Sequence, residues 1–172
     1  RDGDTEAAKE SLKFIDTSAA NASFAQRLQK LIEGGYKGGE GTIPYDVQDV
    51  SRDSTTGARA LVDAAHIDIA EAIRQKFSLL KDKFKVDTKK LESLQNLEAK
   101  IEASGALRHS KNKTKASLPA DNFKAVEKLV GDTKEGQELL NLMRESQVLT
   151  EVHNSDYVGG LSRYTDQFNP LG

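Results

Sequence analysis

Apolar residues recur every three or four positions along most of this chain, and the pattern is longest over residues 54–86. The apolar positions in this stretch are Leu61, Ala65, Ile69, Ile73, Phe77, Leu80 and Phe84. Such spacing is typical of one face of an α-helix, and the hydroxyl side chains of Ser54, Thr55 and Thr56 can cap its first turn. The positions between them are mainly charged and are predicted to face solvent, among them Asp63, Asp68 and Arg74. A helix of this length spans about 45 Å, so the pattern predicts partner helices along its apolar face.

A second apolar series predicts a helix that ends near residue 33. Its members are Leu12, Ile15, Ala19, Ala22, Ala25, Leu28 and Ile32. Five glycines between Gly34 and Gly41 cannot continue a helix, and Pro44 favours an extended conformation at Ile43. Residues 34–53 are therefore predicted to form a long glycine-rich loop inserted between the first two helices.

Three further helices are predicted after the long one. The first follows a cap at Asp87 and ends at Gly105, with an apolar face made of Leu91, Leu94, Leu97 and Ile101. The second begins near Pro119, which suits a first helical turn, and its apolar face is Phe123, Val126, Leu129 and Val130. The third starts at Asp132 or Thr133, and its inward residues are Leu139, Leu142, Met143, Ser146, Leu149 and Val152.

These segments predict an all-α fold, an antiparallel bundle of four to five helices in a single domain that covers residues 1–172. The short breaks at residues 86–88 and 131–133 predict that the adjacent helices are antiparallel or sharply bent. Residues 154–172 contain aromatic side chains without a helical period, so an irregular C-terminal tail is expected.

Composition narrows the class of protein. Apolar residues make up 37% of the 172 positions and charged residues 30%, which is typical of a globular domain. The chain has no cysteine, so disulfides, thiolate metal sites and a cysteine nucleophile are excluded, and its net charge of −2 argues against a nucleic-acid binder. Arg1 is the first residue and Met143 the only methionine, so we expect a processed chain or a fragment, with an exported, secreted or organellar location slightly favoured.

The most concentrated charge lies where the long helix meets the next one, at Lys81, Lys83, Lys85, Lys89 and Lys90. Cations at a helix C-terminus are stabilised by the helix dipole by about 0.3–1 kcal/mol each, and this effect explains most of the cluster. A peripheral site for anionic membrane is the alternative function for the same lysines. The basic segment 108–115 would enlarge such a patch only if it lay nearby, and an antiparallel hairpin carries it to the far end.

No pattern predicts a metal, a cofactor or a small-molecule substrate. His66, His109 and His153 lack ligand-like spacing, and His66 is expected at the edge of the long helix. Asp2 and Asp4 resemble the start of a calcium loop, but the later glycine and glutamate are missing. The glycine run lacks the Gly-Lys-Ser/Thr that completes a phosphate-binding loop.

One short segment allows a catalytic alternative. Gly105, Ala106, Leu107 and Arg108 resemble the Gly-x-Leu-Arg element that carries the arginine finger of bacterial Rho-GTPase-activating effectors, which are small secreted helical bundles. The resemblance implies that Arg108 would stabilise a phosphoryl transition state. It covers only these few residues, and the chain departs from the family at Asn112, where a threonine is expected, and by having no tryptophan.

The function favoured by the sequence is non-catalytic: a helical binding or structural module that docks on a larger protein assembly. The predicted helices use nearly all the apolar residues for a core. The large side chains left over in non-helical segments are candidate anchors for a protein partner, namely Ile43, Tyr45, Tyr157, Tyr164 and Phe168.

Overall fold

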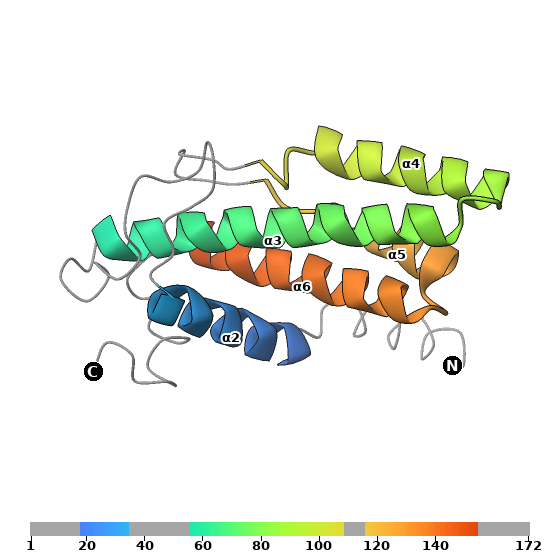
Figure 1. The fold of residues 1–172 in the computed structure, drawn as a ribbon. Helices are drawn as coiled ribbons and strands as arrows, with labels where there is room; N and C mark the ends of the chain where they lie inside the picture. Colours follow the sequence, from blue (N-terminus) through green and yellow to red (C-terminus); the bar gives the residue numbers. More distant parts are fainter. Residues whose placement is uncertain (1–17, 35–55, 109–115, 155–172) are drawn as a thin grey trace, which may run out of the picture.

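A computed structural model describes residues 18–34, 56–108 and 116–154 of the chain. Within these residues the fold consists of helices joined by turns (Figure 1). They are α2 (Ser18–Gly34), α3 (Thr56–Lys83), α4 (Thr88–Ala103), α5 (Ala120–Val130) and α6 (Lys134–Asn154). The prediction of an all-α fold is confirmed.

Helices α3 and α6 pack along each other and form the centre of the bundle (Figure 1). Helix α2 lies on one side and contacts both of them, α4 lies against the opposite side of α3, and α5 contacts α4 and α6. Ion pairs fix the directions. Arg74 and Lys81 of α3 pair with Glu102 and Glu98 of α4 in reverse order, so these two helices are antiparallel.

Helix α2 is antiparallel to α3 but parallel to α6. The side-chain amide of Asn141 on α6 donates a hydrogen bond to the Ser23 hydroxyl on α2, and one turn further along both helices Arg27 pairs with Glu145. The order of these contacts is the same on α2 and α6, and it fixes the register between them.

The helix ends form where local side chains can satisfy the free backbone groups. Asp87 accepts a hydrogen bond from the Lys90 amide at 3.1 Å and caps α4. Gly105 follows α4 with a φ of 81°, a left-handed conformation that favours glycine. Of the two predicted caps for α6, Thr133 is the one used, because its hydroxyl oxygen accepts from the Gly136 amide at 2.9 Å.

The predicted apolar faces form most of the core. On α3, the residues from Leu61 to Leu80 in the predicted series are buried. Helix α2 differs, because Ala19 and Ala22 are exposed while Ala20 and Phe24 are buried instead. The predicted face was rotated on the N-terminal half of this helix: the contacts with both α3 and α6 select the side that carries Phe24.

Two polar residues of α3 also contradict the sequence analysis. Asp63 was expected on the solvent side and His66 at the helix edge, yet both are buried. The reason is the central position of α3, which contacts α2, α4 and α6 on different sides. A helix enclosed in this way buries positions outside its main apolar face.

Candidate functional site

Described residues of α2, α3 and α6 line a groove, which we call the α2–α3–α6 groove. Its volume is about 860 Å³. Helix α2 has 17 residues and α3 has 28, so α2 covers only part of the α3–α6 pair. The residues that line the groove include Ser23, Arg27, Lys30 and Leu31 of α2, Asp68, Ala72, Gln75, Lys76 and Leu79 of α3, and Lys134, Glu138, Asn141, Leu142 and Glu145 of α6.

A charged cluster in the groove holds the three helices together. The guanidinium of Arg27 donates to both Glu145 oxygens, at 2.5 Å from Nε and 3.2 Å from Nη2. Its Nη1 donates to Asp68 on α3. The Glu145 side chain is only 1% exposed, whereas that of Asp68 is 37% exposed. Arg27 therefore pairs with one buried and one half-exposed carboxylate, and the three side chains together keep one net negative charge.

The environment of Arg27 keeps it charged. Burial by itself would lower the pKa of the Arg27 guanidinium, because a charged group is less stable away from water. Hydrogen bonds and charges from Glu145, and then from Asp68, outweigh burial and raise this pKa above its ordinary value. Arg27 therefore remains a cation in contact with Glu145 and Asp68 at neutral pH.

The remaining groove surface combines apolar side chains with two cations that have no acidic partner among the described residues. Leu79 is 55% exposed, and Leu31, Ala72 and Leu142 add apolar area to the lining. Lys76 pairs with Glu138 at 3.0 Å. Lys30 and Lys134 pair with no acidic residue within the described ranges. Apolar area beside unsatisfied charge suits a macromolecular ligand better than it suits catalysis.

The predicted lysine patch is largely used for contacts inside the bundle. Lys81 pairs with Glu98 at 2.6 Å, and Lys83 pairs with Glu135 at 3.0 Å. Lys85 lies 3.9 Å from Asp82, and the Lys90 ammonium lies 4.5 Å from the centre of the Phe84 ring. Lys89 is exposed. Next to these lysines Val86 is 88% exposed in the turn between α3 and α4, outside the groove.

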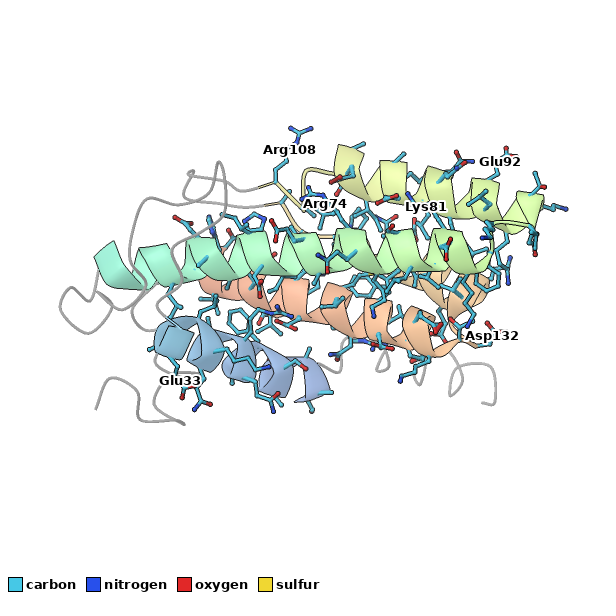
Figure 2. All side chains as sticks on the ribbon, viewed as in Figure 1. Glu33, Arg74, Lys81, Glu92, Arg108 and Asp132 are labelled. Carbon is cyan, nitrogen blue, oxygen red and sulfur yellow. The ribbon has the colours of Figure 1, made fainter. Side chains whose placement is uncertain are left out.

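Arg108 lies at the other end of α4, far from the lysines, as the antiparallel hairpin requires (Figure 2). It is exposed and borders a second hollow of about 360 Å³, together with Ile67, Glu71, Arg74 and Leu107. Hydrogen bonds from Arg74 lower the pKa of Glu102, and the charge of Arg108 contributes further. The Glu102 carboxylate, which interacts with the charge of Arg108, is thus already paired with another arginine.

The five predicted docking residues Ile43, Tyr45, Tyr157, Tyr164 and Phe168 lie outside the described residues, and so does the Gly34–Gly41 loop apart from its first residue. In the described ranges no three His, Cys, Asp or Glu side chains are grouped so that they could hold a metal ion. No helix in those ranges has the length and apolar character needed to cross a membrane.

Sequence reasoning missed the groove and its charged cluster. Arg27 was hidden within a helix predicted only from its apolar positions, and Glu145 was not singled out although it is buried. A usable signal was present: Ser23, Arg27 and Lys30 follow a helical spacing of three and four. That spacing marks a polar face on α2 but does not identify the helix that it meets.

Comparisons with known proteins do not assign the chain to a family: no protein-family model, curated protein or solved structure matches it. A function for the chain is therefore inferred from the groove and its residues.

Proposed function

We propose that this chain is a non-catalytic helical module that docks on a larger protein assembly through the α2–α3–α6 groove. The observation that supports the proposal is the exposure of Leu79. This leucine is 55% exposed beside other apolar groove residues, and burial of its remaining exposed area in an interface contributes about half of the ~1.5–3 kcal/mol that full burial of a leucine gives.

The shape of the groove supports a protein ligand. Three helices supply its lining, and the ionic contacts of Arg27 and the hydrogen bond between Ser23 and Asn141 fix their relative positions. A preformed surface loses little conformational entropy on binding. Apolar side chains surrounded by polar ones are the usual composition of a protein–protein interface.

A matched pair of substitutions tests this function. Leu79 and Val86 are the large apolar residues exposed in the described part of the chain, and only Leu79 lies in the groove. Affinity capture from cells of the source organism is compared for the wild-type chain, Leu79→Lys and Val86→Lys. We expect one stoichiometric protein partner that is retained by Val86→Lys and lost, by about tenfold or more, from Leu79→Lys.

Two outcomes would contradict the proposal. Loss of the partner only in Val86→Lys would move the interface to the turn between α3 and α4, where the lysines lie. Equal retention by both variants would exclude the groove. Both side chains are exposed, so circular dichroism should show unchanged helix content, and this control separates lost binding from lost folding.

A further inference from the structure

We infer that the partner segment held by the α2–α3–α6 groove is an acidic amphipathic helix, with carboxylates near both of its ends and apolar residues between them. This inference rests on the proposed docking function and names the chemistry of its ligand. It follows from which charged residues of the groove are paired within the protein and from where the lysines without a described partner lie.

The acidic groove residues are all paired within the protein. Asp68 and Glu145 both pair with Arg27, and Glu138 pairs with Lys76 at 3.0 Å. The two groove lysines without an acidic partner in the described ranges are Lys30 and Lys134. The groove lining holds four cations and three carboxylates, so its net charge is positive, and the cations free to face a ligand are these two lysines, which carboxylates would complement.

The positions of these lysines set the length of the ligand. Lys134 begins α6, and Arg27 meets Glu145 eleven residues further along that helix. Lys30 lies almost one turn beyond Arg27 on α2, which is parallel to α6. At about 1.5 Å per residue the two ammonium-bearing positions are roughly 21 Å apart along the groove, which corresponds to a helix of about 14 residues.

Between the two lysines the groove offers apolar contacts. Leu79 and Ala72 lie on its α3 side and Leu142 on α6. An α-helix can present a matching apolar stripe with residues spaced by three and four, which is the usual way in which a helix binds in a groove. The exposed carboxylates at its two ends would then reach Lys30 and Lys134.

A charge-exchange experiment tests the inference on the full chain. Three fluorescein-labelled helical peptides of about 14 residues share a leucine and alanine stripe and carry glutamate, glutamine or lysine in their first and last turns. Binding is measured by fluorescence anisotropy to the wild-type chain, to Lys30→Glu/Lys134→Glu, and to the control Lys124→Glu/Lys128→Glu. The control lysines are exposed on α5 and lie outside the groove.

We expect the wild-type chain to bind the glutamate peptide at least about tenfold more tightly than the lysine peptide, because two attractive pairs replace two repulsive ones. The groove variant should reverse this order, and the α5 variant should keep it. The preference should also weaken as sodium chloride rises from about 0.05 M to about 0.5 M.

The possible failures are distinguishable. Equal binding of all three peptides, with binding lost in Leu79→Lys, would overturn the acidic ligand but keep the docking groove. If the α5 variant abolishes the preference for the glutamate peptide, the site that binds acidic peptides lies on α5 and not in the groove. No binding of any peptide would overturn the helical ligand, and capture of a partner that Leu79→Lys loses would then show that the groove still docks a protein of another kind. Dimerisation of the chain that only the groove variants abolish would assign the groove to a second copy and overturn the inference.

Discussion

Single charged residues contribute unequally in this bundle, and burial decides the difference. The Arg74–Glu102 pair has side chains that are about two-fifths exposed, and such surface pairs contribute about 0–1 kcal/mol. Glu145 is almost fully buried and has Arg27 as its cationic partner. Removing a partner from a buried charge costs more than any surface pair contributes, because the remaining charge is left without water.

A double-mutant cycle at Arg27 and Glu145 tests this difference. Arg27→Met is expected to destabilise the fold by about 2–3 kcal/mol, because it leaves the Glu145 carboxylate buried and unpaired. Arg27→Met combined with Glu145→Leu should recover most of that loss. Urea unfolding followed by circular dichroism gives the free energies, and Asp68→Asn, at a half-exposed position, should cost less than about 1 kcal/mol. Strictly additive single effects would contradict the buried pair.

At the residue scale the sequence predicts apolar positions better than polar ones. Leu61, Ile69 and Phe77 are buried as their spacing indicates, because the hydrophobic effect acts on each of these side chains wherever the helix packs. The burial of Asp63, His66 and Glu145 depends on which helices surround them. That information is long-range, and no local pattern contains it.

At the scale of helices, the element boundaries follow from local chemistry and were predicted closely. Asp87, Gly105 and Thr133 act as the sequence indicates, since a cap needs only neighbouring backbone groups. The long helix was predicted over residues 54–86 and is Thr56–Lys83.

The pairing of helices was less predictable. Lys83 contacts Glu135 of α6, 52 positions away, and this contact uses a lysine that the sequence assigned to a surface patch.

Ion pairs between helices make stability depend on pH. Hydrogen bonds from Arg74 lower the pKa of Glu102, and hydrogen bonds from Lys83 lower that of Glu135, relative to the ordinary value of 4.5. A carboxyl whose pKa is lower in the folded state adds stability above its unfolded pKa and loses it as pH falls through the folded value. Acidification below about pH 4.5 should therefore remove this contribution.

Thermal unfolding at pH 7 and at about pH 3 measures the effect. Glu102→Gln and Glu135→Gln should melt at a lower temperature than the wild-type chain at pH 7, and the curves should converge at the acidic pH. Glu92→Gln is the control, because Glu92 is exposed on α4 (Figure 2) and pairs with no basic residue among those described. Equal differences at the two pH values would show that the ion pairs do not contribute.

At the scale of the whole molecule, the unequal lengths of the helices produce the candidate site. The long helices α3 and α6 form the centre, and among the described residues the shorter α2 covers only part of their surface, beside the α2–α3–α6 groove. The sequence predicted the helices and the all-α bundle, and it placed the candidate docking residues in non-helical segments that lie outside the described residues. A groove results from how three helices are placed relative to one another, and helix periodicity does not determine that placement.

The most direct test of the account is a titration of the isotopically labelled chain with the glutamate-ended peptide, followed by NMR. If the groove binds an acidic helix, backbone amide shifts change along one side of each groove helix, with the largest changes near Lys30, Leu79 and Lys134. Changes confined to the turn at Val86, or to the surroundings of Arg108, would contradict it and would place the functional surface at one end of α4.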